Sequence, residues 1–279
     1  MRPRAILFGE ALIDEYPDRR MVAGSPLHVA VHLAALDWET YLVSRLGSDN
    51  DGEWILETLS EHGVADDMVE MDDELPTGTV EVVFAEDGSH DFTICGPAAW
   101  DAIVGPESLP DHDVFVFSGL AARDARSAGA LWRLLGLSDA RVKVFDVTMR
   151  PPDVVSAVIA RGLAESTLLK VNDEEASAVA DIVGTADPMA WMTANPSLSW
   201  VCVTHGEDGA DLYSAGGDHA SVSGVSVKIV DTVGAGDTFN AGLIDALARG
   251  EDSERALVKA QTLAATTVNQ RGGLPKSDR

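Results

Sequence analysis

Short apolar runs alternate along the chain with stretches of helical periodicity. The apolar runs stand at 5–8, 40–44, 114–117, 142–145, 168–171 and 200–203, and the helix-like stretches near 51–61, 123–136, 153–164 and 173–183. Strands that alternate with helices predict a doubly wound α/β fold, in which a mostly parallel sheet is covered by helices on both faces. Such sheets bind ligands beyond the carboxyl ends of their strands. With 279 residues, we expect a single domain over 1–279.

One segment interrupts this alternation and has the pattern of a β-hairpin. Residues 79–84 and 91–94 alternate apolar with polar side chains, and Asp87-Gly88 between them is a strong turn signal. The apolar face of such a small sheet needs cover from the main domain, a ligand or a second chain. We expect a small β-sheet lid formed by about 11–22 and 76–96, and a homodimer through this lid. The alternative is an edge hairpin without a role in binding.

The charge of the chain argues against two classes of partner. Asp and Glu number 46 against 20 Lys and Arg, which gives a net charge of −26. Such an acidic surface repels phosphate backbones and anionic lipid, so we expect neither nucleic acid nor membrane as a partner. The two cysteines, Cys95 and Cys202, form no Cys-x-x-Cys pair, which is typical of a reducing compartment. The expected location is therefore cytoplasmic. The acidity fits a salt-adapted host or a mesophilic protein kept soluble by its charge.

The most informative stretch is a glycine-rich turn that opens a helix. Gly234-Ala235-Gly236 is small enough for the backbone to approach a ligand closely, and helical periodicity follows it. The free N–H groups and the positive end of the dipole at such a helix start favour an anion. Asp237 lies in the first turn. It fits a favourable N-terminal helix residue, and it equally fits a general base for a hydroxyl that attacks a phosphoryl group.

The segment 230–239 closely resembles the signature of the ribokinase/PfkB family of sugar kinases. Further matches follow the family's order along the chain, at 9–14, 23–30, 45–49, 76–78, 99–101, 146–150 and 172–175. The segments 9–14 and 99–101 look most like the fructokinase branch. The resemblance implies a ribokinase-like fold and an ATP-dependent phosphotransferase that acts on an alcohol group of a small carbohydrate, with fructose as the first expectation.

The resemblance also implies roles on the phosphate side. Asp237 would take the proton from the sugar hydroxyl, and the N–H groups of 234–236 would form the anion hole for the γ-phosphate. Asn172 and Glu175 match an Asn-x-x-Glu element that holds Mg²⁺ and phosphate, largely through water, which suits a cation that keeps several waters. The two residues by themselves also fit a helix cap with its first-turn acid.

Three further sets of residues carry over from the family. Nucleotide contacts are expected at Asn172, Thr204, Gly206 and Asn269. A monovalent cation such as K⁺, which some members bind, would lie at Asp231 and Val233. Contacts with the substrate are expected at Asp14, Gly24, His28 and Arg150. Taken alone, Asp14 also fits a solvated turn, and Arg150 also fits a surface ion pair.

The chain departs from the family mainly on the sugar side. Ala23-Gly24 stands where Gly-Gly is usual, His28 replaces an Asn that normally bonds the sugar, and Thr148 replaces another Asn. His28 either reshapes the sugar pocket or is an ordinary polar residue of the helix that Ser25-Pro26 predicts, with Ser25 as the N-cap. Two alternatives therefore stay open: a PfkB-type kinase for a nucleoside or a keto-deoxy sugar acid, and a ligand-binding regulator with weak turnover.

Overall fold

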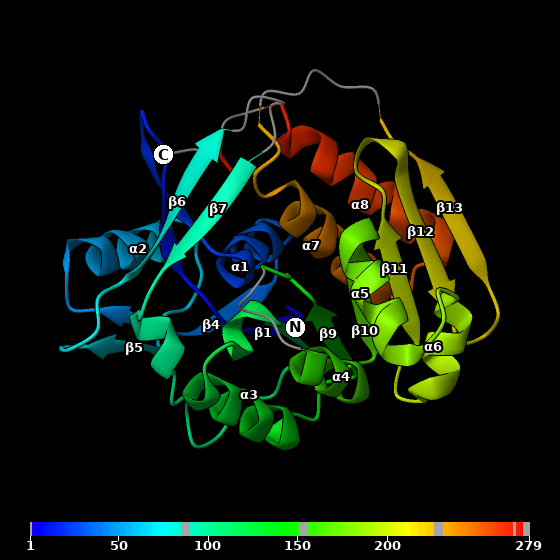
Figure 1. The fold of residues 1–279 in the computed structure, drawn as a ribbon, viewed down its shortest axis with the longest axis horizontal. Helices are drawn as coiled ribbons and strands as arrows, with labels where there is room; N and C mark the ends of the chain where they lie inside the picture. The colour runs from blue at the N-terminus through cyan, green and yellow to red at the C-terminus, as the bar shows by residue number, and fades with distance from the viewer. Residues whose placement is uncertain (1, 85–89, 151–155, 226–230, 270–271, 276–279) are drawn as a thin grey trace.

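The computed structural model describes residues 2–84, 90–150, 156–225, 231–269 and 272–275 (Figure 1). The strands of the large central sheet are β1 (Arg4–Phe8), β4 (Glu39–Gly47), β5 (Val69–Asp72), β8 (Val114–Ser118), β9 (Val142–Asp146), β10 (Leu168–Asn172), β11 (Trp200–Thr204), β12 (Gly209–Ser214) and β13 (His219–Ser223). Their order is β13-β12-β11-β10-β9-β8-β1-β4-β5. Neighbours from β11 to β5 pair in parallel, whereas β12 and β13 form an antiparallel edge. The predicted mostly parallel sheet is confirmed.

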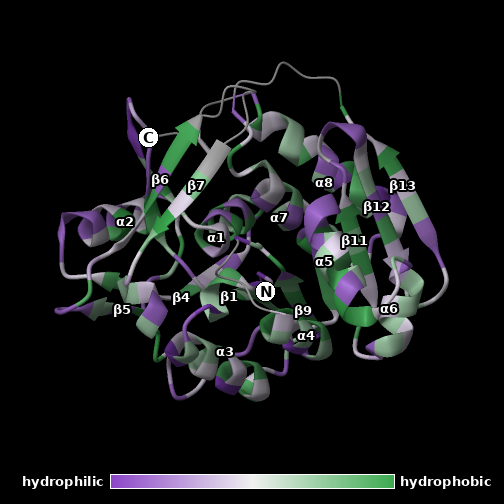
Figure 2. Ribbon diagram, viewed as in Figure 1, coloured by the Kyte–Doolittle hydropathy of each residue, from purple (hydrophilic) through white to green (hydrophobic). Residues whose placement is uncertain are grey.

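Helices cover both faces of this sheet. One face carries α1 (Ser25–Ala35), α2 (Asn50–Glu61), α7 (Ala235–Ala248) and α8 (Ser253–Thr267), and the other carries α3 (Ala125–Leu137), α4 (Ser156–Glu165), α5 (Asp173–Val183) and α6 (Pro188–Ala194). Strand β1 supplies both cores, because Ala5 and Leu7 point to the first face and Ile6 and Phe8 to the second. Strands buried on both faces explain the continuous apolar runs at the centre of Figure 2. Among the helices described, none combines the length and apolar content needed to cross a bilayer.

A second, four-stranded sheet projects beside the end of β1 (Figure 1). Its strands are β2 (Leu12–Glu15), β3 (Arg20–Ala23), β6 (Gly78–Phe84) and β7 (His90–Cys95), in the order β3-β2-β6-β7. The antiparallel pair β6–β7 confirms the predicted hairpin, whose Asp87-Gly88 turn lies outside the described residues. Val80 and Val82 pack in a cluster with Leu12, Tyr16 and Ala23. These residues lie on or next to neighbouring strands of the same sheet. Val80, Phe92 and Ile94 of the hairpin line a cavity between this sheet and the main domain, and Phe92 is 36% exposed. The apolar face is therefore not fully covered, and the homodimer stays a prediction.

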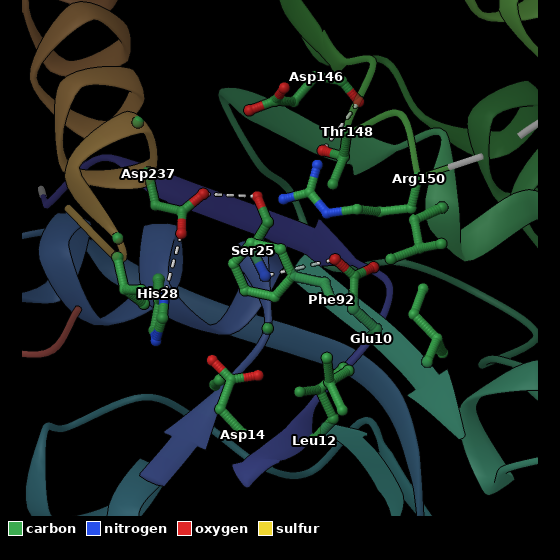
Figure 3. A pocket seen from close by; sticks show the side chains of 18 of the residues that line it. Glu10, Leu12, Asp14, Ser25, His28, Phe92, Asp146, Thr148, Arg150 and Asp237 are labelled. Carbon is green, nitrogen blue, oxygen red and sulfur yellow. Dashed lines mark hydrogen bonds and ion pairs between the residues drawn. The ribbon is translucent and has the colours of Figure 1, made fainter. Parts of the chain in front are cut away.

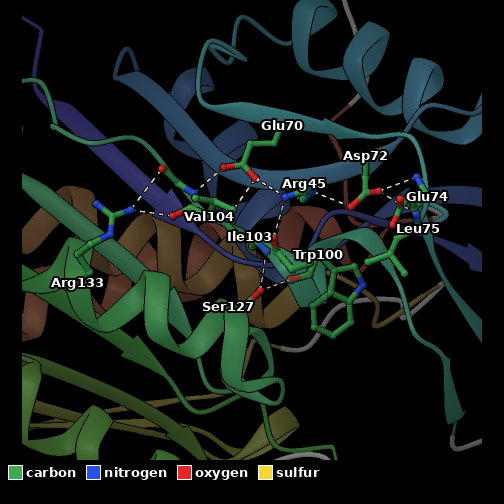
Figure 4. A network of polar contacts seen from close by, with 12 residues as sticks. Arg45, Glu70, Asp72, Glu74, Leu75, Trp100, Ile103, Val104, Ser127 and Arg133 are labelled. Carbon is green, nitrogen blue, oxygen red and sulfur yellow. Dashed lines mark hydrogen bonds and ion pairs between the residues drawn. The ribbon is translucent and has the colours of Figure 1, made fainter.

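A polar network fixes the chain that follows β7 against the main sheet (Figure 4). Arg45 on β4 forms ion pairs with Asp72 at 2.8 Å and with Glu70 at 3.3 Å. Glu70 in turn accepts the backbone N–H of Val104 at 3.1 Å, and Arg133 on α3 donates to the Val104 carbonyl at 2.7 Å. These contacts join β4, β5 and α3 at the base of the second sheet.

Two of the family-like segments, 45–49 and 76–78, bind each other at this base. Asp49 accepts the N–H of Gly52 at 2.8 Å, which caps α2, and the N–H of Thr77 at 2.9 Å. The Thr77 hydroxyl accepts the N–H of Gly47 at 2.9 Å. We infer that these motifs hold the start of β6 in place rather than contact a ligand.

Candidate active site

Two adjoining cavities lie beyond the carboxyl ends of the central strands. The first, of about 520 Å³, lies between the main domain and the second sheet, and the second, of about 620 Å³, lies between β11, β12 and helices α7 and α8. The residues that line both are Lys170, Asn172, Thr232 and Gly236. A parallel sheet is expected to bind its ligands at this edge, and the shared wall allows two bound molecules to meet.

The glycine-rich turn forms part of that shared wall. Gly234 is the N-cap of α7 at φ +75°, and a Cβ there would lie 2.3 Å from the Gly273 Cα, so only glycine fits. The N–H of Ala235 donates to the Thr232 carbonyl at 3.2 Å. The amides of the cavity-lining Gly234 and Gly236 have no acceptor among the described residues. They are the donors that the helix start offers to an anion.

Asp237 faces the first cavity from the first turn of α7 and is held from two sides (Figure 3). The Ser25 hydroxyl donates to Oδ1 at 2.7 Å, and His28 Nδ1 lies 2.9 Å from Oδ2. Burial by itself raises the pKa of Asp237. The hydrogen bond and charge of His28, together with the hydrogen bond from Ser25, outweigh burial and lower the pKa below its usual value. The side chain remains 16% exposed, so a ligand in the cavity can reach an ionised carboxylate.

His28 lies beside Asp237 and is only 3% exposed. Burial lowers the pKa of the imidazole, yet the hydrogen bond to Asp237 and the charges of Asp237 and Asp14 raise it above its usual value. The ring lines the first cavity, and the backbone of Val22 also contributes to the raised pKa. His28, which was expected to contact the sugar, is therefore already bonded to Asp237 of the protein itself.

The predicted N-cap at Ser25 is wrong by one residue. Gly24, at φ +123°, is the N-cap, and a Cβ there would lie 2.4 Å from the Glu10 carbonyl oxygen. Ser25 is the first residue of α1, and its hydroxyl bonds Asp237 instead of capping the helix. The hydrogen bond to the distant Asp237 therefore takes the place of the N-cap bond that a serine at a helix start usually makes.

Glu10 is a site residue that the sequence analysis missed. It lies just beyond β1, lines the first cavity and is 1% exposed. Its carboxyl accepts the Ser118 hydroxyl at 2.8 Å and the Ser25 N–H at 3.3 Å. Burial raises the pKa of Glu10 to about 7. A carboxyl group directly after an apolar strand was the available signal.

The other predicted sugar contacts line the first cavity as well. Asp14 and Arg150 lie on different sides of it (Figure 3). Burial raises the pKa of Asp14 to about 6. The Arg150 guanidinium lies 5.1 Å from the centre of the Phe92 ring, which belongs to β7. Thr148 stands between β9 and Arg150 at φ +43°, a left-handed conformation that is unusual for a β-branched residue.

Lys170 was also missed, although a lone lysine inside an apolar strand was visible in the sequence. Its Nζ lies 3.3 Å from Asp146 Oδ1, and Asn240 on α7 donates to Asp146 Oδ2 at 3.2 Å. Burial by itself would lower the pKa of Lys170, but the charges of Asp146, Glu175 and Asp237 raise it above its usual value. A charged ammonium therefore stands at the wall between the cavities.

Asn172 and Glu175 form the helix cap that was one of the two interpretations of this pair. The Asn172 side chain accepts the Glu175 N–H, and the Glu175 carboxylate accepts the N–H groups of Asn172 and Met149, each at 2.9 Å. Both residues nevertheless line the first cavity. The described residues contain no cluster of three or more His, Cys, Asp or Glu side chains that could hold a metal. These oxygens fit Mg²⁺ contacted through water, which is a ligation that this ion accepts.

The predicted nucleotide residues separate into two groups. Thr204 and Gly206 line the second cavity. Asn269 does not line it, because its side chain is exposed and donates to the Ala265 carbonyl at 3.0 Å. The remaining wall is mixed: Glu207, Asp208 and Gln261 line it beside an apolar part made of Val225, Phe239, Ala264, Ala265 and Val268. The apolar part suits a flat aromatic ring.

Of the two predicted monovalent-cation residues, Val233 lines the first cavity, whereas Asp231 is buried and lines neither cavity. Asp231 accepts the N–H groups of Val233 and Gly272, each at 3.1 Å. Arg19 forms an ion pair with the same carboxylate at 3.3 Å. A positive charge from the chain itself thus already faces Asp231.

Comparison with known proteins places these cavities in context. The profile described as pfkB family carbohydrate kinase matches residues 18–278. The chain is 26% identical to the aminoimidazole riboside kinase of Salmonella typhimurium, over 96% of this chain and 90% of the relative. It is 27% identical to the fructokinase of Solanum tuberosum (97% and 91%) and 28% identical to the ATP-dependent ribose-1-phosphate kinase of Halopiger xanaduensis (95% and 85%).

Solved structures show the same fold. The fructokinase of Xylella fastidiosa with bound ATP superposes with a TM-score of 0.85 at 21% identity, over 99% of this chain and 96% of that one. The fructokinase of Vibrio cholerae with fructose, ADP and calcium gives a TM-score of 0.83 at 24% identity, over 98% and 94%. The ribokinase-like α/β fold predicted from the sequence is confirmed.

Proposed function

The chain belongs to the pfkB family of carbohydrate kinases, and we propose from this that it transfers the γ-phosphoryl group of ATP to a hydroxyl of a neutral sugar, with fructose as the first candidate. The observation that supports this most directly is the position of Asp237. It is an ionised carboxylate next to a helix start, close to the wall that two cavities share.

The two cavities divide the substrates between them. The first offers carboxylates and a lid, which suit a polyol, and the second has an apolar side that suits the adenine of ATP. The γ-phosphate would lie at the shared wall, between the Gly236 amide and the Lys170 ammonium. Both groups donate hydrogen bonds, and the ammonium is also positively charged. They would stabilise the negative charge on the phosphoryl oxygens.

The reaction then needs few protein groups. The sugar hydroxyl oxygen forms the new bond to the γ-phosphorus, the bond from that phosphorus to the bridging oxygen of ADP breaks, and the hydroxyl proton passes to Asp237. Positioning and charge stabilisation carry most of the catalysis in such a transfer. When bound with ATP, Mg²⁺ would neutralise phosphate charge, and Asn172 and Glu175 would hold it through water.

The charge of the first cavity favours a neutral substrate. Its lining includes the carboxyl groups of Glu10, Asp14, Asp146, Glu175 and Asp237. Among the described residues, the Lys and Arg side chains that line it are Arg150 and Lys170, and Lys170 is already paired with Asp146. An anionic sugar would meet an excess of negative charge, whereas sugar hydroxyls can donate hydrogen bonds to Asp14.

Arg150 supports a second candidate, a sugar that carries an acidic group. The guanidinium lines the first cavity on the side away from Asp14, and arginine binds carboxylates and phosphates in a bidentate manner. The relative from Halopiger is named for a phosphorylated sugar. Arg150→Gln would then lower kcat/KM for an acidic sugar and leave that for fructose much less affected.

A coupled assay of ADP release tests these candidates. The purified protein with Mg-ATP is offered fructose, ribose, a nucleoside, a keto-deoxy sugar acid and ribose 1-phosphate. Asp237→Asn should lose roughly 10²–10⁴-fold in kcat, the usual contribution of a general base, and Asp111→Asn on the exposed far end of the sheet serves as the control. Unchanged turnover in Asp237→Asn would exclude this residue as the base. Tight binding of a sugar without ADP release would instead indicate a regulator.

A further inference from the structure

Two residues in the first turns of α1, Ser25 and His28, bond the carboxylate of Asp237. We propose that His28 is a positioning residue, which holds Asp237 as a fixed, ionised carboxylate through a buried ion pair. This inference rests on the proposed role of Asp237 as the base. It gives the histidine a role directed at the carboxylate rather than at the sugar.

The geometry fixes both oxygens of the carboxylate. His28 Nδ1 lies 2.9 Å from Oδ2 and the Ser25 hydroxyl donates to Oδ1 at 2.7 Å. One donor on each oxygen prevents rotation of the group. Each oxygen keeps a further lone pair, which remains able to accept a substrate hydroxyl.

The imidazole is itself held in place from behind. A Cβ on Gly273 would lie 2.6 Å from His28 Cε1 and 2.9 Å from the Gly234 Cα, so the backbone at 273 packs between the ring and the glycine-rich turn. One turn further along α1, His32 Nε2 lies 2.7 Å from the Gly273 carbonyl. The backbone at 273 therefore limits rotation of the ring on the side away from the first cavity.

The surrounding charges favour the ion pair over a neutral pair. His28 faces Asp237 on α7 and Asp14 on β2, while burial lowers the pKa of its neighbour His32 and keeps that ring neutral. The other charged or titratable groups that act on Asp237 are Lys170, Glu10, Asp14 and Asp146. Opposite shifts in the pKa of His28 (raised) and Asp237 (lowered) follow from the pairing.

The pairing has a consequence for the proton. A doubly protonated His28 cannot accept the proton of the sugar hydroxyl, so Asp237 receives it and passes it to solvent. A carboxylate with a lowered pKa is a weak base. A weak base is sufficient where the bond between the γ-phosphorus and the leaving ADP is largely broken before the nucleophile loses its proton.

Two substitutions separate the charge of His28 from its hydrogen bond. His28→Asn places an amide N–H close to the position of Nδ1 without a charge, and His28→Leu removes both the donor and the charge. Ser25→Ala removes a neutral donor from the other oxygen. His112→Asn is the matched control, because His112 bonds Ser138 and the Pro110 carbonyl, away from both cavities.

Imidazole ¹⁵N NMR of the free protein measures the pair without any turnover. The His28 resonance, identified by its loss in His28→Asn, should report both ring nitrogens protonated at pH values above the usual 6.5, and Asp237→Asn should bring its titration down. Titration of His28 at or below 6.5 in the wild type, or no change in Asp237→Asn, would overturn the proposal. Because this readout needs no substrate, a failure of the kinase assay alone would count against the proposed function and not against the ion pair.

The pH profile then tests what the pair does. With Mg-ATP and a saturating concentration of the sugar that the panel identifies, the titration of Asp14 in sugar binding does not contribute. The acid limb of kcat should then move to higher pH in His28→Asn by about one unit, so that the rate on that limb falls roughly tenfold. His28→Leu should add a loss of kcat at all pH values, and His112→Asn should match the wild type. An acid limb that stays in place in a folded His28→Asn would show that the histidine does not set the ionisation of Asp237.

Discussion

The Lys170 ammonium lies 3.3 Å from Asp146 Oδ1 in a buried pair at the wall between the two cavities. Asn240 on α7 bonds the other oxygen of Asp146. The pair thus joins β9 and β10 to the helix that carries Asp237. It stabilises the junction between the sheet and the glycine-rich turn, and it supplies charge where a phosphate would lie.

Lys170→Met should destabilise the fold strongly. Removal of one partner leaves Asp146 buried and unpaired, which typically costs about 3–5 kcal/mol. The pKa of the orphaned carboxyl should rise further, so the loss should be larger at pH 8 than at pH 5, because a raised acid stabilises the native state only while it holds its proton. Urea unfolding at both pH values measures this. Lys143→Met, whose ammonium bonds only the Leu135 carbonyl among the described residues, should cost little, and equal losses in the two variants would contradict the expectation.

Gly236→Ala should separate stability from activity. A Cβ at 236 meets nothing closer than the Lys170 ammonium at 3.6 Å, and alanine favours a helix over glycine by about 1 kcal/mol. The melting temperature should therefore hold or rise. The added methyl group stands at the shared wall and should weaken phosphate binding there, roughly tenfold in KM for ATP if one charge-assisted hydrogen bond is lost.

The control for that substitution is Gly129→Ala, in the exposed middle of α3, where a Cβ meets no atom within 4 Å. It should raise the melting temperature and leave KM for ATP unchanged. If both variants retained the wild-type KM, the phosphate would have to bind away from the start of α7.

Asp14→Asn should stabilise the protein while it impairs sugar binding. Burial raises the pKa of Asp14 to about 6, so the native state binds a proton more tightly than the unfolded chain does. This group's contribution to stability is full below its unfolded pKa and falls as pH rises towards 6. The neutral amide should raise the melting temperature at pH 7 and much less at pH 4. KM for the sugar should increase in the variant, and in the wild type it should increase below about pH 6.

Thr148→Asn should stabilise the turn after β9. Thr148 has φ +43°, where a β-branched side chain is strained and asparagine is accepted more readily. The gain should be about 1 kcal/mol in the free energy of unfolding. Thr148→Val keeps the branching and loses the hydroxyl, so it should bring no such gain; a gain from valine would place the cost in the hydroxyl instead of the backbone.

Local signals in the sequence predicted most of the fold. The apolar runs at 5–8 and 168–171 became β1 and β10 because strands buried on both faces need continuous apolar residues. The glycine-rich turn, α7 and the position of Asp237 also followed from neighbouring residues. The hairpin pattern predicted β6 and β7, and β2 and most of β3 lie within the 11–22 segment expected to join them in the lid. The pairing of β2 with β6 in parallel was not visible in the pattern.

Contacts between segments that are far apart in the sequence could not be predicted from it. Ser25 has the features of an N-cap, yet its hydroxyl bonds a carboxylate 212 residues away. His28 was assigned to sugar binding, because its partner Asp237 lies on α7 and is not near it in the sequence. Lys170 was visible as a charge within an apolar strand, but only the pairing of β9 with β10 supplies its partner Asp146.

The 209 residues that separate His28 from Asp237 also set the order in which the enzyme matures. A ribosome has released α1 long before it synthesises α7, and the segment that packs behind the imidazole is translated later still. A nascent chain that ends before α7 therefore lacks the Asp237 carboxylate, so the pair with His28 can form only after nearly the whole chain has been synthesised.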